Sequence, residues 1–151
     1  MKHVRYVVLG ALILLVFASC MTPPAQNEEA VLNVLIMLEN GEGAKLIEHT
    51  HTPFLLDAEI IESDVDMQSF WTLLADRGFA FPAPQIISLT EVTAESAALF
   101  GDTMEVQAFF TRYVPEDAAI AEVETNGTRY RFIFAGKLNG LPRLYGWKGP
   151  L

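Results

Sequence analysis

Two Asn-Gly pairs, at residues 126–127 and 139–140, constrain the fold of this chain more than any other feature. Asn-Gly between runs of alternating side chains is the strongest short-range signal for a two-residue hairpin turn, because both residues accept a positive φ. The chain around them therefore predicts an antiparallel meander of three strands, over residues 119–125, 128–138 and 141–148.

The two turns also predict which side chains share a face of the sheet, since side chains alternate along a strand. The first turn places Glu122 opposite Arg131 and Glu124 opposite Arg129, as cross-strand ion pairs. The second places Phe134 opposite Tyr145, and Phe132 opposite Trp147. Both registers then put the large apolar side chains on one face, namely Val123, Tyr130, Phe132, Phe134, Tyr145 and Trp147.

The segments before the meander predict three helices and further strands. Asn27 is a plausible N-cap for a buried helix that ends at Asn40-Gly41, residues 43–49 form a short helix, and Ser63 or Asp64 caps a third that Gly78 ends. Apolar and β-branched runs predict strands over residues 54–62, 86–93 and 104–114, with Phe54, Leu56, Ala58 and Ile60 on one face of the first. This order predicts an α+β domain whose helices are segregated to one face of a long antiparallel sheet.

The first twenty residues have the layout of a secretory signal. Lys2 and Arg5 give a basic start, and residues 7–17 form an unbroken apolar run. The run is shorter than the roughly 20 residues that a transmembrane helix needs. The alternatives are an uncleaved anchor helix and an ordinary signal that is cut elsewhere.

The end of that run, Val16-Phe17-Ala18-Ser19-Cys20, resembles the lipobox of bacterial lipoproteins, although Phe17 stands where that family usually has Leu, Val or Ile. The resemblance implies cleavage before Cys20, lipidation of its sulfur, and a lipid-anchored address at the cell membrane or outer membrane. Residues 1–19 are then a signal peptide, residues 20–27 the lipidated cysteine and a Pro-Pro tether, and residues 28–151 a single domain.

The domain itself resembles the nuclear transport factor 2-like superfamily, which includes polyketide cyclases and steroid isomerases. The resemblance rests on the buried helix from Glu28 to Leu38, the segments 40–42, 45–47 and 53–57, the helix that carries Trp71, and the terminal strands. It implies a cone-like fold in which N-terminal helices pack on a curved, mostly antiparallel sheet. It also implies a pocket between helices and sheet, and a sheet that can mediate a homodimer.

Charge excludes one class of partner. The chain has 10 basic and 19 acidic residues; without Lys2 and Arg5 the mature part has 8 basic and 19 acidic, a net charge of −11. All 19 acids lie in residues 28–124, and residues 129–151 hold five basic residues and no acid. A domain this acidic is repelled by phosphate backbones, so we do not expect nucleic-acid binding. The basic C-terminal segment is either a patch for an anionic ligand or lipid surface, or the cross-strand partner of acids, which we favour.

Few residues suggest chemistry. His49 and His51 could hold Zn²⁺ with Glu48 or Asp57, but without a third histidine in the mature chain a polar, water-facing connection is the favoured interpretation. Asp57 is expected on the outer face of its strand, away from any pocket. The sequence predicts no cofactor. An aromatic set either lines a pocket or forms ordinary core, which we favour; its members are Trp71, Phe109, Tyr113, Tyr130, Phe132, Phe134, Tyr145 and Trp147.

These features predict a membrane-anchored protein of the cell envelope that acts as a non-enzymatic binding or assembly module. Its partner would be a small apolar ligand or another envelope protein. One alternative is an isomerase, dehydratase or cyclase that acts on a small apolar substrate in the cone. Another is a purely structural envelope protein.

Overall fold

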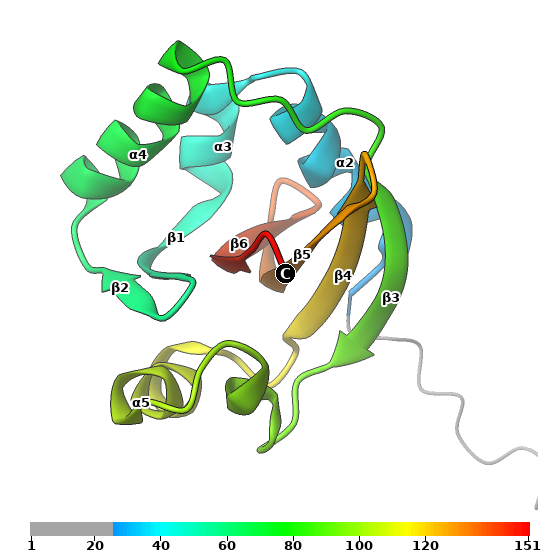
Figure 1. Ribbon diagram of the computed structural model, residues 1–151. Helices are drawn as coiled ribbons and strands as arrows, with labels where there is room; N and C mark the ends of the chain where they lie inside the picture. Colours follow the sequence, from blue (N-terminus) through cyan, green and yellow to red (C-terminus); the bar gives the residue numbers. More distant parts are fainter. Residues whose placement is uncertain (1–25) are drawn as a thin grey trace, which may run out of the picture.

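The computed structural model describes residues 26–151, so the predicted signal peptide, Cys20 and most of the tether lie outside the described residues. The described chain has an α+β fold (Figure 1). None of the helices in this part of the chain is both long and apolar enough to cross a membrane. The elements in chain order are α2 (Glu28–Glu39), α3 (Gly43–His49), β1 (Thr50–Leu56), β2 (Glu59–Ile61), α4 (Asp64–Asp76), β3 (Gln85–Glu91), the 3₁₀ helix η1 (Ser96–Leu99), α5 (Met104–Tyr113), β4 (Ala119–Thr125), β5 (Thr128–Leu138) and β6 (Leu141–Lys148).

The strands form one open, bent sheet in the order β2-β1-β6-β5-β4-β3 (Figure 1). Neighbouring strands are antiparallel except β1 and β6, which run parallel. The sheet is therefore mixed, with the predicted meander β4-β5-β6 at its centre.

Three predicted helices are confirmed, α2, α3 and α4, and so are the predicted caps of α2 and α4. The Asn27 side chain accepts a hydrogen bond from the backbone N–H of Glu29 at 2.8 Å, and the Ser63 hydroxyl accepts one from Asp66 N–H at 3.3 Å. These side chains satisfy donors that have no partner within the first turn of α2 and α4.

The first hairpin has the predicted register throughout. Thr125 pairs with Thr128, and the charged pairs Glu124 with Arg129 and Glu122 with Arg131 follow. Asn126 and Gly127 both have positive φ, at 49° and 72°, as a two-residue turn of this type requires.

The second hairpin departs from the predicted register in its middle. Phe132 pairs with Trp147 as predicted, but Phe134 pairs with Leu144 rather than with Tyr145. One bulge adds a residue to β5 near Gly136, whose φ is 57°, and a second adds Tyr145 to β6, so the two shifts cancel. Tyr145 consequently lies on the face opposite to the predicted one, because a bulge reverses the alternation of side chains.

The predicted strand over residues 104–114 is wrong, because this segment forms helix α5. The Thr103 hydroxyl accepts a hydrogen bond from Val106 N–H at 3.3 Å, and Val106 and Phe109 are buried at helical spacing. The aromatic and β-branched residues of this segment favoured a strand in the sequence. The Thr103 cap and the burial of one helical face stabilise the helix instead.

The predicted strand over residues 54–62 is also wrong in part. It is a hairpin, β1 and β2, that turns at Asp57, whose φ is 54°. The expected common face does not form, since Phe54 packs into one core cluster while Ile60 packs against the other.

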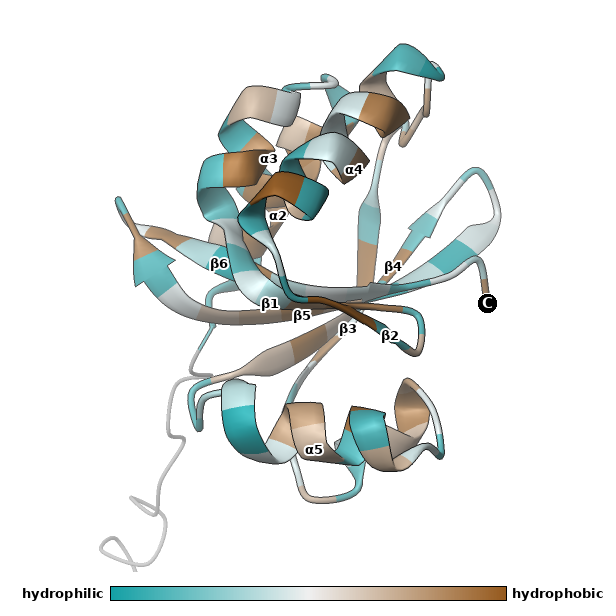
Figure 2. Ribbon diagram, turned by 90° about the vertical axis from the view of Figure 1, so that its left-hand side faces the viewer, coloured by the Kyte–Doolittle hydropathy of each residue, from teal (hydrophilic) through white to brown (hydrophobic). Residues whose placement is uncertain are grey.

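Helices cover both faces of the sheet, contrary to the expected one-sided arrangement. Figure 2 shows α2, α3 and α4 above the sheet and α5 below it. Each face has its own apolar core, one built around Trp71, Phe132 and Trp147 and the other around Phe100, Phe109 and Ile133. Helix α5 lies on the second face because its Val106 and Phe109 complete that second core.

Candidate functional site

Aromatic rings fill the space between helices α2–α4 and the sheet. Trp147, the last residue but one of β6, has five ring neighbours whose centroids lie 5.3–6.1 Å away: Phe70, Trp71, Phe79, Tyr130 and Phe132. Most of these contacts are tilted or edge-to-face, the arrangements that aromatic rings prefer. We call Trp147 and these five neighbours the aromatic cluster.

The structure divides the predicted pocket set between the two faces of the sheet. Trp71, Tyr130, Phe132, Phe134 and Trp147 lie together on the α2–α4 side, as expected. Phe109 and Tyr113 come from α5, and Tyr145 is turned over by the bulge, so these three lie on the opposite face. The prediction that all eight line one space is therefore wrong.

Sequence reasoning missed two members of the aromatic cluster, Phe70 and Phe79. Phe70 precedes Trp71 in α4, and the predicted apolar face of this helix includes both rings, but only Trp71 was assigned to the pocket set. Phe79 follows α4 in a connection without regular structure. The signal that could have found it is the run Phe79-Ala80-Phe81, which is too apolar for a solvated loop.

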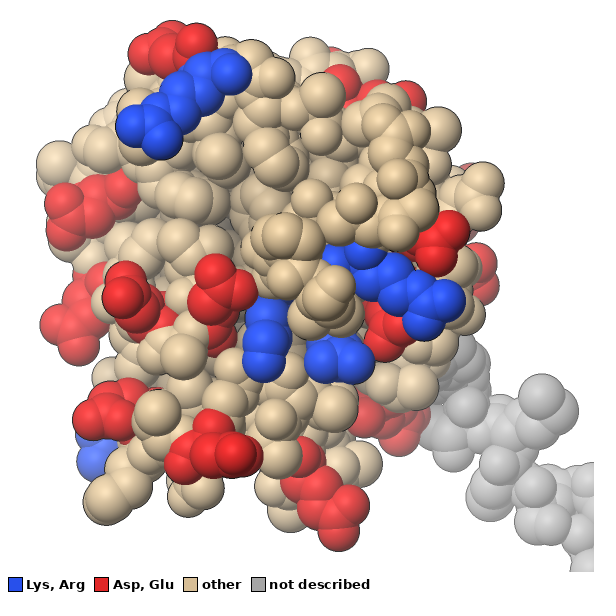
Figure 3. Space-filling view, in the orientation of Figure 1, with Lys and Arg blue, Asp and Glu red and all other residues tan. Residues whose placement is uncertain are grey.

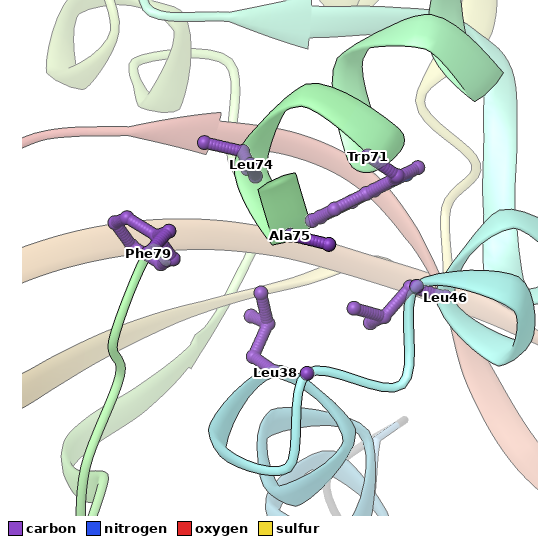
Figure 4. A pocket seen from close by; sticks show the side chains of 8 residues that line it. Leu38, Leu46, Trp71, Leu74, Ala75 and Phe79 are labelled. Atoms are coloured by element: carbon purple, nitrogen blue, oxygen red, sulfur yellow. The ribbon is translucent and has the colours of Figure 1, made fainter. Parts of the chain in front are cut away.

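The cavity that remains beside the aromatic cluster is small and apolar. Its volume is about 20 Å³, which is room for one water molecule. Figure 4 shows the lining side chains of α2, α3 and α4 pointing toward one another across it. The lining residues are Leu38, Gly41, Gly43, Leu46, Trp71, Leu74, Ala75 and Phe79, and none of them is titratable.

Two indole N–H groups lie in this region with different surroundings. Trp71 Nε1 donates to Thr50 Oγ1 at 3.0 Å, and that hydroxyl donates to the carbonyl of Leu46 at 2.6 Å. Trp147 Nε1 is buried and has no hydrogen-bond partner in the described part of the chain. Buried polar groups are normally paired, so the Trp147 donor is the unusual polar group of the cluster.

The two histidines considered as metal ligands belong to different elements and have different surroundings. His49 is buried at the end of α3, while the ring of His51 in β1 stacks on Tyr145 at a centroid distance of 4.1 Å. Burial lowers the pKa of His51, an effect that the contact of its Nδ1 with the Pro53 carbonyl at 3.2 Å partly opposes. Residues 26–151 contain no group of three or more His, Cys, Asp or Glu side chains placed to hold a metal ion.

Asp57 lies outside the aromatic space, at the exposed turn of the β1-β2 hairpin, as the sequence indicated. Its backbone N–H donates to the Trp147 carbonyl at 2.7 Å, and its Oδ1 accepts from Gly149 N–H at 2.9 Å. Asp57 therefore fixes the C-terminal segment against the hairpin.

Acids partner Arg129 and Arg131 of β5, as predicted. Arg129 contacts Glu122 at 3.1 Å and Glu124 at 3.2 Å, and Arg131 contacts Glu122 at 3.4 Å. Figure 3 shows this mixture of basic and acidic side chains on one face. Lys148 Nζ donates to the carbonyls of Leu99 and Phe100, which ties η1 to the sheet.

Several larger hollows are open to solvent. One, of about 460 Å³, lies between η1 and α5, and another, of about 370 Å³, lies beside the start of α4. The second contains Arg143, whose Nη2 donates to the Thr50 carbonyl at 3.1 Å. Neither hollow brings a titratable pair into hydrogen-bond contact.

Comparison of the chain with protein families, with curated proteins and with solved structures finds no match.

Proposed function

We propose that this chain is a lipid-anchored protein of the bacterial cell envelope, and that its domain is a binding or assembly module rather than an enzyme. The observation that carries the second part is the filled space between α2–α4 and the sheet. The cavity beside it, among α2, α3 and α4, has a volume of about 20 Å³, far smaller than the several hundred Å³ of a small-molecule site.

The lining chemistry supports the same proposal. General acid–base catalysis needs a titratable side chain within hydrogen-bond reach of the reacting atoms. The cavity is lined by apolar residues and glycines, and Trp71, its one polar member, already donates to Thr50. A binding or assembly role uses the outer surface instead, which this rigid aromatic core would hold in shape.

The anchor part of the proposal rests on the sequence up to Cys20. A basic start, a short apolar run and small residues before a lone cysteine together support lipidation of that sulfur. Each buried CH₂ of an acyl chain contributes ~0.8 kcal/mol, so two or three chains hold a protein on a membrane far longer than one chain does.

We also propose that the domain is similar to the nuclear transport factor 2-like superfamily in its cone-like form. The order of elements supports this, since two helices, a strand hairpin and a third helix precede the remaining strands, and these three helices cover one face of the bent sheet. The homodimer that this resemblance implies stays a prediction.

A second candidate, an isomerase, dehydratase or cyclase for a small apolar substrate, is favoured by one observation. Trp147 Nε1 is a buried donor without a partner, and a ligand with a carbonyl group could accept from it if α4 moved outward. Hydrophobic ketones titrated into the protein would then change its tryptophan fluorescence saturably, and Trp147→Phe would abolish the change. Absence of saturable binding would favour the non-enzymatic module.

The anchor is tested by expressing the full chain and its Cys20→Ala variant in a bacterial host fed with labelled palmitate. We expect the parent chain to fractionate with membranes and to carry the label, and the variant to lose both. Met21→Ala is the matched control, because it changes the neighbouring residue and leaves the sulfur. Unchanged membrane retention of Cys20→Ala, or mass spectrometry that finds residues 1–19 still attached, would overturn the proposal.

A further inference from the structure

The first residue that the structure describes is held firmly on the domain. The side chain of Gln26 is fully buried, which is unusual for a polar residue that precedes the first helix. Its Nε2 donates to the backbone carbonyl of Asp117 at 2.9 Å and approaches Asp117 Oδ2 at 3.3 Å. Asp117 belongs to the connection between α5 and β4, so this contact joins segments 91 positions apart.

The same carboxylate connects Gln26 to the central sheet. Asp117 Oδ2 accepts a hydrogen bond from Gly136 N–H at 3.0 Å, at the bulge of β5. Gly136 is only three residues before Asn139, where the β5-β6 turn begins. We call Gln26, Asp117, Gly136 and the Asn139-Gly140 turn the near end of the domain.

The opposite end of β5 holds the other turn and the C-terminus. Strand β5 has 11 residues, and at ~3.4 Å per residue its length is about 35 Å. It starts after the Asn126-Gly127 turn, and Leu151 N–H donates to the carbonyl of Arg129 at 2.9 Å. We call the Asn126-Gly127 turn and Leu151 the far end; Figure 2 marks the C-terminus at this end of the sheet.

We infer that the near end faces the membrane and that the far end, with the C-terminus, points away from it. This inference rests on the proposed lipid anchor at Cys20. Five residues separate Cys20 from Gln26, so the lipidated sulfur and Gln26 are at most about 20 Å apart even in a fully extended chain. That reach is shorter than β5, and Gln26 is fixed to one end of β5.

The charge of the domain favours an upright orientation, with the near end toward the membrane, over one in which β5 lies along the membrane surface. The mature chain carries a net charge of −11 (8 basic minus 19 acidic residues). A membrane leaflet that contains anionic lipids therefore repels it. Glu28 and Glu29 lie two and three residues after Gln26 and are exposed, so the near end stays above the headgroups without inserting between them. Lying flat would bring more of the acidic surface to the lipid, so the domain stands with β5 inclined away from the membrane.

The test measures the height of the two turns above the lipid. The full lipidated chain is purified from a bacterial host and placed in vesicles of phosphatidylethanolamine and phosphatidylglycerol with an energy acceptor on the headgroups. Cys20 is the chain's one cysteine and its sulfur is lipidated, so Asn139→Cys and Asn126→Cys each accept a single donor dye. The two sites are matched, because each asparagine is the first residue of an Asn-Gly turn, with φ of 53° and 49°.

We expect energy transfer from the dye at position 139 to be several times that from position 126. Equal or reversed transfer, from protein that floats with the vesicles, would overturn the orientation and leave the anchor intact. Protein that does not float with the vesicles would overturn the proposed lipid anchor itself.

The role of the Gln26 contact is tested by adding Gln26→Ala to both labelled variants. We expect the difference between the two transfer efficiencies to become smaller, because the tether would then be fixed to the domain only at Asn27 and would be about 3.5 Å longer. Asn27→Ala is the matched control; it removes the cap of α2 but keeps the contact with Asp117, and it should leave the difference in place. A difference that Gln26→Ala leaves unchanged, with the fold confirmed by circular dichroism, would contradict the orienting role of this contact.

Discussion

Trp71 and Thr50 form a buried hydrogen bond, Nε1 to Oγ1 at 3.0 Å, that connects helix α4 to strand β1. The hydroxyl in turn donates a hydrogen bond to the Leu46 carbonyl at 2.6 Å, so two consecutive hydrogen bonds connect α4, β1 and α3 inside an apolar region. Both hydrogen bonds depend on the Thr50 hydroxyl oxygen, which accepts from Trp71 and donates to Leu46, so Thr50 is the residue to test.

Thr50→Val keeps the shape of the side chain and removes the hydroxyl. We expect a loss of about 1–3 kcal/mol in the free energy of unfolding, because the Trp71 donor is left buried without a partner. Urea denaturation measures it. Thr52→Val, in the same strand, is the control and should change stability by less than about 0.5 kcal/mol; equal effects of the two variants would contradict the role of the hydroxyl.

Stability should fall as the pH is lowered through the ordinary range of histidine titration. Burial lowers the pKa of His51 in the folded protein below 6.5, so the unfolded chain binds the proton more readily. The stability that neutral His51 contributes is therefore fully present above pH 6.5. It is lost as the pH falls from there through the lowered pKa of His51. Urea midpoints at pH 7.5 and 5.5 measure the decrease.

His51→Phe keeps an aromatic ring on Tyr145 and cannot titrate. The variant should show a smaller decrease between the two pH values than the parent protein. An identical decrease in both proteins would assign it to other groups.

Two Gly→Ala substitutions should have opposite effects. A Cβ at Gly146 would lie 3.0 Å from the Leu55 carbonyl oxygen and 3.0 Å from Ile133 Cδ1, and the backbone atom cannot move aside cheaply. Gly146→Ala should destabilise the protein by about 1–3 kcal/mol. At Gly43 the nearest atom is 3.8 Å away, so Gly43→Ala in α3 should be neutral or stabilising by up to about 1 kcal/mol. Melting temperatures of the two variants would show the contrast.

Glu122 contacts both Arg129 and Arg131 on a partly exposed surface. Glu122→Gln should cost about 0.2–1 kcal/mol, since ion pairs at this exposure are weak. The cost should shrink in 1 M salt, because exposed charges are screened. A cost that does not depend on salt would indicate that the side chain acts through packing instead.

Short-range interactions explain what the sequence by itself determined. The two Asn-Gly turns, the caps Asn27 and Ser63, and the pairing of β4 with β5 each depend on residues a few positions apart. Turn geometry and capping are local, so they could be predicted residue by residue. The aromatic residues of β5, together with Trp147, were placed on one face for the same reason.

The tertiary structure alone decided the rest. Residues 104–113 have strand-like composition, yet they form α5, because Phe109 and Val106 bury one helical face against the second side of the sheet. Two compensating bulges, of which Gly136 marks only the one in β5, turned Tyr145 to that side, where its ring stacks on His51. Packing also brought Phe79 from a loop onto Trp147 and left a cavity of about 20 Å³. Whether an aromatic set encloses a pocket or fills it depends on side chains that are distant in sequence, so only the assembled core could determine it.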